Sequence, residues 1–278
     1  MDLGLEHRVC AVTGASRGIG LDAARRLCAE GASVLLIARS EDALEEAVER
    51  CVADGEARGG RAMAQALDVT AEDAGERMLA AAEKGFGRLD VLVNNAGTAR
   101  WRPLDEVPDA DWQAAWEVNV MGPLRAMRAA VPGMRERGWG RIVNVSSTSG
   151  KRPSALMPEY SVAKSAMLSL SRLFADLYAK EGVLVNAVCP GPTKSPLWMD
   201  PGGLLDQSPR SPTWARVRRH SRRPARGGRS GASRSLTRSP RSSSGSAPST
   251  PRTWRAPPGR STEAPSRSSS RRFWTWIR

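Results

Sequence analysis

The regular alternation of short apolar runs with longer amphipathic stretches constrains the fold of this chain more than any other feature. Runs rich in apolar and β-branched residues predict strands that are buried on both faces of a parallel sheet. Six such runs span residues 8–13, 33–38, 62–67, 91–94, 142–145 and 183–188. Stretches with helical periodicity occupy residues 19–30, 41–54, 71–84, 109–137 and 159–181. Because this order implies right-handed βαβ crossovers, we expect an α/β fold with a doubly wound parallel sheet.

The length of 278 residues suits one large α/β domain with an appendage, and such a domain needs no disulfide or metal to be stable. The four cysteines are scattered and lack the spacing of a metal site, so we expect free thiols, no metal and a reducing, cytoplasmic location. The first eight residues are charged, which predicts no secretory signal. No apolar run reaches about eighteen residues, so we expect no membrane span.

The net charge of +13 is confined to one end of the sequence. Residues 201–278 carry 18 arginines, no lysine and two acidic residues, whereas the first two hundred residues carry 24 basic and 27 acidic side chains. The alternation of strands and helices stops near residue 206, and the Ser-, Arg- and Pro-rich sequence that follows has few residues able to form a core. We therefore predict one folded domain over residues 1–205 and a disordered basic tail over residues 206–278.

A glycine-rich turn separates the first predicted strand from the first predicted helix. Its sequence is Thr-Gly-Ala-Ser-Arg-Gly-Ile-Gly over residues 13–20. Glycines let the backbone approach a pyrophosphate, while the N-terminus of the helix supplies N–H donors and the positive end of a dipole. The position after a buried strand favours a dinucleotide-binding turn over a purely structural one, and with it a Rossmann-type sheet. The predicted cofactor contacts in this turn are Gly14, Ser16, Arg17, Gly18, Ile19 and Gly20.

The end of the second predicted strand bears on the choice between NAD(H) and NADP(H). An NAD(H) site commonly has an acidic residue there, which accepts hydrogen bonds from the ribose. This chain has Arg39 instead, and Arg17 lies nearby in the glycine-rich turn. Two guanidinium groups suit the 2′-phosphate of NADP(H), so we predict that NADP(H) is preferred over NAD(H). The alternative is that Arg39 only solvates a loop.

Further candidate cofactor contacts follow the third and fourth strands. Asp68 and Val69 end the third, where a carboxylate can accept a hydrogen bond from an adenine amino group. The alternative for Asp68 is the N-cap of the next helix. Asn95, Ala96 and Gly97 follow the fourth strand. The asparagines at 94 and 95 can tie neighbouring strands together, and the small pair leaves space for the cofactor.

Ser147, Tyr160 and Lys164 form the candidate catalytic group. Tyr160 and Lys164 are four residues apart, so both side chains lie on one face of the predicted helix. A nearby ammonium group lowers the pKa of a tyrosine, as does the cationic nicotinamide of the oxidised cofactor. The phenol then becomes usable as general acid or base for an alcohol–carbonyl pair. Ser147 follows the fifth strand and can hydrogen-bond the same substrate oxygen. With the glycine-rich turn, this spacing predicts a metal-free, NAD(P)-dependent oxidoreductase.

These motifs resemble those of the short-chain dehydrogenase/reductase family over residues 1–205. The matching segments are the glycine-rich turn, Asn-Asn-Ala-Gly at 94–97, Asn-Val-Met-Gly at 119–122, Ser147, Tyr-Ser-Val-Ala-Lys at 160–164 and Pro-Gly-Pro-Thr at 190–193. The resemblance implies that Asn119 holds a water linking Lys164 to solvent, which completes a proton relay. It also implies that Lys164, next to Tyr160, binds the nicotinamide ribose.

The resemblance has further implications for the cofactor, the substrate and the assembly. Pro190, Gly191 and Thr193 are expected to face the nicotinamide. The expected substrate is a small-molecule ketone or secondary alcohol, and the expected assembly is a homo-oligomer. Residues 147–151 are similar to the ketoreductases of fatty-acid and polyketide synthesis.

The sequence departs from the family after the Pro-Gly motif, since neither the family's last helix nor its seventh strand is recognisable. We hypothesise that the tail is an out-of-frame reading of a GC-rich gene. A one-base shift in suitable codons for Asp-Glu-Ile-Ala-Ala-Val-Val-Val and Val-Asp-Gly-Gly, two family-like segments, gives residues 237–244 and 261–264. Without a seventh strand, the sixth strand is an open edge and apolar faces beside it stay exposed.

Two other functions remain as alternatives at this stage. A truncated relative, impaired in catalysis, would at most bind the cofactor. A nucleic-acid-binding protein would use the arginine-rich tail for salt-dependent contacts with phosphates. The tail offers tryptophans for stacking but contains no recognisable nucleic-acid-reading module. We therefore rank a nucleic acid well below a small-molecule substrate as partner.

Overall fold

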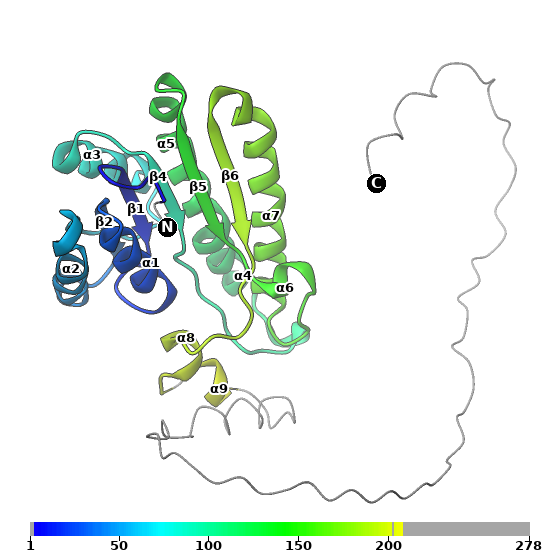
Figure 1. Ribbon diagram of the computed structural model, residues 1–278. Coiled ribbons are helices and arrows are strands. Elements are labelled where there is room, and N and C mark those ends of the chain that lie inside the picture. The colour runs from blue at the N-terminus through cyan, green and yellow to red at the C-terminus, as the bar shows by residue number, and fades with distance from the viewer. Residues whose placement is uncertain (1–2, 202, 208–278) are drawn as a thin grey trace, which may run out of the picture. The chain divides into compact units, whose positions relative to one another are not determined.

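The computed structural model describes residues 3–201 and 203–207 (Figure 1). The prediction of a disordered basic tail therefore lies outside the described residues, except at Asp206 and Gln207. The hypothesis of an out-of-frame reading concerns residues 237–244 and 261–264, which also lie outside the described residues. Within the described part of the chain, no helix is long and apolar enough to cross a bilayer. The same residues contain no group of three or more His, Cys, Asp or Glu side chains that could hold a metal ion.

Six parallel strands form one sheet (Figure 1). They are β1 (Val9–Thr13), β2 (Ser33–Ala38), β3 (Arg61–Ala66), β4 (Val91–Asn94), β5 (Gly140–Val145) and β6 (Val183–Val188). Their order across the sheet is β3-β2-β1-β4-β5-β6, and every neighbouring pair is parallel. The chain winds outward from β1 in one direction and then from β4 in the other. The predicted Rossmann-type, doubly wound sheet is confirmed.

The helices cover the sheet on both faces. They are α1 (Gly18–Ala29), α2 (Glu41–Gly55), η1 (Glu56–Arg58), α3 (Ala74–Phe86), η2 (Leu104–Glu106), α4 (Asp109–Trp116), η3 (Glu117–Met121), α5 (Gly122–Glu136), α6 (Thr148–Lys151), α7 (Pro158–Tyr178), η4 (Ala179–Glu181), α8 (Pro196–Met199) and α9 (Leu204–Gln207). Apolar side chains of α1 and α2 pack with Val12 and Val34 on one face. Those of α3, α5 and α7 pack with Ala11 and Leu35 on the other. Because neighbouring residues of β1 point to opposite faces and all are buried, the strand has no polar alternation.

Three features of the helices differ from the sequence-based expectations. The helix expected at 71–84 begins only at Ala74. The single helix expected at 109–137 is divided by η3, a π-helical segment between α4 and α5. The short helices α6, α8 and α9 were not predicted, because four residues are too few to display helical periodicity.

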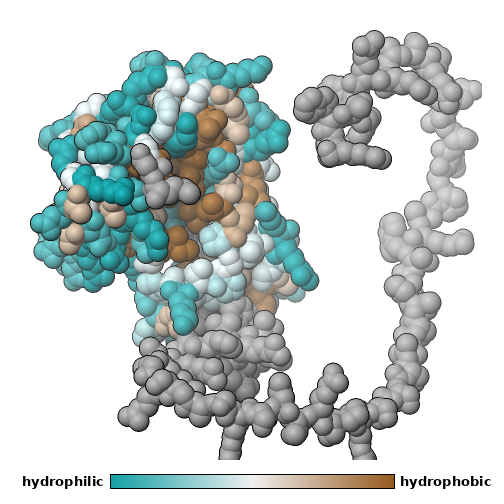
Figure 2. Space-filling model, in the orientation of Figure 1, coloured by the Kyte–Doolittle hydropathy of each residue, from teal (hydrophilic) through white to brown (hydrophobic). Residues whose placement is uncertain are grey.

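Strand β6 is an edge of the described sheet, as the lack of a recognisable seventh strand predicts. Val183 and Val185 pack into the core with α5 and α7. Leu184 and Val188 are 42% and 44% exposed, and Leu184 points to the opposite face because side chains alternate along a strand. Figure 2 shows an apolar patch over β5 and β6. The expected exposure of apolar side chains beside this edge is confirmed within the described residues.

Candidate active site

A cleft opens at the carboxyl ends of the strands, near the point between β1 and β4 where the strand order reverses. Ligands of doubly wound sheets bind at such a point, because the loops after the two strands diverge there. All but two of the predicted site residues line this cleft. Those that do are Gly14, Ser16, Arg17, Gly18, Ile19, Arg39, Asp68, Val69, Asn95, Ala96, Gly97, Ser147, Tyr160, Lys164, Pro190, Gly191 and Thr193. The two exceptions, Gly20 and Asn119, lie behind the lining.

The glycine-rich turn is packed too tightly for side chains. Gly14 has a φ of +65°, a conformation that favours glycine. A Cβ on Gly20 would lie 2.3 Å from the carbonyl oxygen of Gly14 and 2.4 Å from Nδ2 of Asn95. Gly20 therefore shapes the turn from behind the cleft lining, and its predicted contact with the cofactor stays a prediction. Arg17, the N-cap of α1, makes no side-chain capping bond, so no cap competes for the first N–H groups of the helix.

The asparagines after β4 tie neighbouring strands together, as predicted. Nδ2 of Asn95 donates to the carbonyl oxygens of Thr13, at 3.0 Å, and Gly14, at 3.1 Å. The backbone N–H groups of Asn95 and Ala96 both donate to the hydroxyl of Thr13. Asn94 donates to the side chain of Asn144 on β5, at 2.8 Å. The turn after β1 is therefore fixed by the loop after β4.

Two arginines line the part of the cleft beyond the glycine-rich turn. Nη1 of Arg17 donates to Oδ2 of Asp200, which follows α8, at 3.0 Å. The side chain of Arg39, directly after β2, is exposed. Both guanidinium groups thus lie on the side of the cleft where the sequence predicts the 2′-phosphate, and one of them already has an acidic partner.

Asp68 is held by its own loop. Its Oδ1 accepts hydrogen bonds from the backbone N–H and the hydroxyl of Thr70, at 2.9 and 2.8 Å. The backbone bond, then the hydroxyl bond and the charge of Arg39, lower the pKa of Asp68. Because α3 begins at Ala74 with Asp73 as its N-cap, the alternative interpretation of Asp68 as a helix N-cap is wrong.

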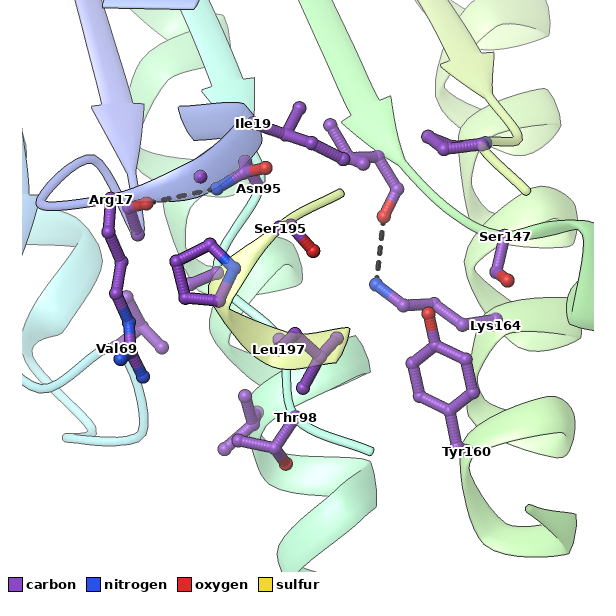
Figure 3. Close-up of a pocket in the computed structure, with 18 of the residues that line it drawn as sticks. Arg17, Ile19, Val69, Asn95, Thr98, Ser147, Tyr160, Lys164, Ser195 and Leu197 are labelled. Carbon is purple, nitrogen blue, oxygen red and sulfur yellow. Dashed lines mark hydrogen bonds between the residues drawn. The ribbon is translucent and has the colours of Figure 1, made fainter. Parts of the chain in front are cut away.

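Tyr160 and Lys164 project from one face of α7, and Ser147 lies opposite them after β5 (Figure 3). The Nζ atom of Lys164 lies 5.6 Å from the centre of the Tyr160 ring. It donates to the carbonyl oxygen of Val145, at 2.8 Å, which fixes the long side chain. The hydroxyl of Ser147 accepts a hydrogen bond from the backbone N–H of Ser149, at 3.1 Å. The candidate catalytic group is therefore assembled in one place.

Burial controls the protonation of this group. It lowers the pKa of Lys164, which is 3% exposed, to about 8. It also raises the pKa of Tyr160, and the nearby hydroxyl of Ser147 acts in the opposite direction with less effect. This direction is opposite to the one expected from the nearby ammonium, because removal of the phenol from water has the larger effect in the described site. The lowering expected from a cationic nicotinamide stays a prediction.

Asn119 lies inside η3 and is completely buried. Its Nδ2 donates to the carbonyl oxygens of Ala115, at 3.0 Å, and Thr98, at 3.3 Å. Its Oδ1 has no hydrogen-bond partner among the described residues. A Cβ on Gly97 would lie 2.8 Å from this oxygen and 3.3 Å from Nζ of Lys164. Asn119 and Lys164 therefore converge on Gly97, and a buried acceptor without a protein partner is typical of a water site.

The segment after Ser195, which the sequence also places at the substrate pocket, supplies further cleft residues, although the sequence does not single out Leu197 or Leu204. Ser195 and Leu197 lie on the segment that carries α8, and Leu204 begins α9. Ser195 and Leu204 are buried, with exposures of 8% and 1%. Figure 3 shows Ser195 and Leu197 between Arg17 on one side and the Tyr160–Lys164 pair on the other. A serine before a proline and an apolar run is a helix-start signal, and it could have indicated α8.

Proteins of similar sequence are reductases and dehydrogenases. The sequence model of the short chain dehydrogenases matches residues 8–202. The chain is 38% identical over 192 residues to the short-chain reductase protein NovJ of Streptomyces niveus, covering 69% of this chain and 71% of that protein. It is 33% identical over 195 residues to the D-beta-hydroxybutyrate dehydrogenase of Cupriavidus necator, covering 69% of this chain and 73% of that protein.

Two solved structures of similar fold contain nicotinamide cofactors. The L-sorbose reductase from Gluconobacter frateurii, complexed with NADPH and L-sorbose, has a TM-score of 0.68 and 37% identity. The match covers 72% of this chain and 74% of that one. The NAD⁺-bound xylitol dehydrogenase has a TM-score of 0.64 and 32% identity, covering 67% of this chain and 71% of that one.

Proposed function

The chain belongs to the short-chain dehydrogenase family, and we propose that it exchanges a hydride between NADP(H) and a ketone or secondary alcohol, with Tyr160 as general acid or base. NAD(P)-dependent oxidoreduction follows from the family. The roles of single residues, the preference for NADP(H) and the substrate class are the proposal. One observation carries it: a single cleft has the glycine-rich turn at one end and the Tyr160–Lys164 pair, with Ser147, at the other.

The residues of the cleft fit a nicotinamide dinucleotide. Gly14 and Gly20 keep the backbone of the turn free of side chains, so that a pyrophosphate can approach it. Ala96 and Gly97 leave space beside the turn, in front of Asn119 and Lys164. The bound cofactor supplies or accepts the hydride. The polypeptide must bind and orient it, and must hold and move the proton.

In the reducing direction, Tyr160 donates its phenolic proton to the carbonyl oxygen of the substrate. Its raised pKa keeps the phenol protonated at neutral pH, which supports this direction. Ser147 hydrogen-bonds the same oxygen and holds it near the phenol. Lys164, with a pKa of about 8, is mostly protonated at neutral pH and can help to return a proton to Tyr160. Asn119 holds the water that links Lys164 to solvent.

The preference for NADP(H) rests on Arg17 and Arg39. Both guanidinium groups line the cleft, and Arg39 stands directly after β2, at the position where an NAD(H) site commonly has an acidic side chain. The similar solved structures include both an NADPH complex and an NAD⁺ complex, so the preference is argued from these two residues alone.

The substrate side of the cleft is lined by apolar side chains, among them Met157, Leu197 and Leu204. They support a small organic carbonyl compound or alcohol as the substrate. The similarity to a D-beta-hydroxybutyrate dehydrogenase and an L-sorbose reductase supports the same substrate class. We also propose that residues 1–205 form the catalytic domain and act in the cytoplasm, where free thiols persist. A homo-oligomer is supported by Leu173 and Leu177, which are 59% and 63% exposed on α7.

The direct test is nucleotide oxidation by the purified chain. NADPH or NADH is mixed with a panel of small ketones, a ketose and a β-keto ester, and its absorbance is followed. We expect ketone-dependent oxidation that is faster with NADPH. Enhanced NADPH fluorescence without turnover of any ketone would instead identify a catalytically impaired relative. Faster turnover with NADH would overturn the cofactor preference.

A further inference from the structure

The segment that carries α8 and α9 is fastened to the glycine-rich turn. Ser195, at its start, is 8% exposed. A Cβ on Gly18 would lie 3.3 Å from Cδ of Pro196, so the segment packs directly on the turn. Past the end of α8, Asp200 accepts the hydrogen bond from Arg17, at 3.0 Å. This ion pair joins two parts of the chain that are 183 residues apart in sequence.

The carboxylate of Asp200 accepts a hydrogen bond from Nη1 of Arg17, and the proposed function requires this guanidinium to bind the 2′-phosphate of NADP(H). Arg17 is one of the two guanidinium groups that we assign to the 2′-phosphate of NADP(H). A phosphate and a carboxylate use the same N–H donors of a guanidinium. Arg39 differs from Arg17 because no carboxylate lies within ion-pair distance of its guanidinium among the residues that the structure describes. Its charge only lowers the pKa of Asp68, whose Oδ1 is already bound to Thr70.

We propose that Asp200 is a specificity-determining residue, whose carboxylate competes with the 2′-phosphate of NADP(H) for Arg17 and thereby limits the preference for NADP(H) over NAD(H). This inference rests on the proposed function. NADP(H) must displace Asp200 from Arg17, or bind with its 2′-phosphate close to the negatively charged carboxylate of Asp200. NAD(H) has a hydroxyl at the 2′ position and leaves the ion pair intact. Asp200 therefore weakens the binding of one nucleotide and not of the other.

The exposure of the ion pair limits the size of this effect. The side chains of Arg17 and Asp200 are 70% and 47% exposed, and exposed pairs are weak. Removing the carboxylate frees the donor and also removes a negative charge near the dianionic phosphate. We therefore expect Asp200→Asn to tighten NADPH binding about three- to five-fold, and to change NADH binding less than about two-fold.

Equilibrium titrations with NADPH and NADH, followed by nucleotide fluorescence, test the inference without any turnover. They are made on the full chain, on Asp200→Asn and on Asp200→Glu, which retains the charge. Asp22→Asn is the matched control, because Asp22 forms an exposed ion pair with Arg26 on the same helix, at 2.9 Å, and does not line the cleft. Calorimetry with adenosine 2′,5′-bisphosphate and with AMP repeats the comparison without the nicotinamide.

The expected result is tighter binding of NADPH and of the bisphosphate in Asp200→Asn only, with Asp200→Glu and Asp22→Asn close to the unaltered chain. Equal changes for NADPH and NADH would assign Asp200 a purely structural role and overturn the inference, while the proposed function would stand. Unchanged NADPH binding in Asp200→Asn would also overturn it. If the unaltered chain bound neither nucleotide, the proposed function would fail and this inference with it.

Discussion

Replacing Lys164 with methionine should change how the stability of the protein depends on pH. Lys164 is 3% exposed, and its Nζ has one protein acceptor, the carbonyl oxygen of Val145. Burial lowers its pKa from 10.5 to about 8 in the folded chain. Methionine has a similar length and no charge, so the variant lacks this titration. The comparison isolates the effect of the buried Lys164 ammonium on the free energy of unfolding.

The direction and size of the effect follow from the two pKa values. Below pH 8 the folded and unfolded chains both carry the ammonium, so the desolvation penalty is fully present. From pH 8 to 10.5 the unfolded chain binds more protons than the folded chain, so stability rises with pH. At about 1.4 kcal/mol per pKa unit, the whole penalty is about 3 kcal/mol. Between pH 7 and 9.5 the wild type should therefore gain about 2 kcal/mol relative to Lys164→Met.

Urea denaturation of both proteins at pH 7 and 9.5 measures this difference. The contributions of other titrating groups cancel when the two free energies of unfolding are subtracted at each pH. A gap that moves by about 2 kcal/mol in favour of the wild type is the expected result. A constant gap would instead show that Lys164 titrates in the folded chain as it does in water.

Four other outcomes are expected. Gly20→Ala should destabilise the fold by about 1–3 kcal/mol in urea and weaken NADPH binding, because its Cβ would meet the Gly14 carbonyl; unchanged binding would contradict this. Asp90→Ala should lower the free energy of unfolding by about 3 kcal/mol, because buried Asp90 accepts hydrogen bonds from the backbone N–H of Val9 and the guanidinium of Arg88. A loss below about 1 kcal/mol would show that these hydrogen bonds contribute little to stability. Alcohol oxidation should accelerate from about pH 7 to 10, since the raised pKa of Tyr160 leaves little phenolate at neutrality, and a flat profile would argue against this base. Resequencing the coding DNA beyond codon 195 should reveal a missing or extra base, and an intact frame would end that hypothesis.

The sheet and the positions of the candidate catalytic side chains could be predicted because both depend on short-range patterns. Short runs of apolar and β-branched residues such as Val9–Thr13 predict buried strands, and the glycine-rich turn fixes where the chain enters the first helix. The four-residue spacing of Tyr160 and Lys164 sets them on one helical face whatever surrounds them. The cleft collects these residues because parallel strands place their carboxyl ends at one edge of the sheet.

The features that could not be predicted depend on contacts between distant residues. The pairing of Arg17 with Asp200 has no local sequence signal. The same is true of the close approach of Gly20 to the carbonyl oxygen of Gly14, which leaves no room for a side chain at position 20. The π-helical segment around Asn119 keeps helical composition and differs only in its hydrogen bonds. The direction of the pKa shift of Tyr160 depends on the amount of protein packed around it, which the spacing to Lys164 does not reveal.

In the proposed NADP(H)-dependent reduction, Tyr160 transfers the proton. The chain has two tyrosines, so Tyr178→Phe is a matched control; Tyr178 packs against Phe174 and does not line the cleft. The measurement is NADPH binding and ketone-dependent NADPH oxidation by Tyr160→Phe and Tyr178→Phe side by side. We predict that Tyr160→Phe still binds NADPH and loses turnover by at least about a hundred-fold, while Tyr178→Phe keeps both. Comparable turnover in the two variants would contradict the account.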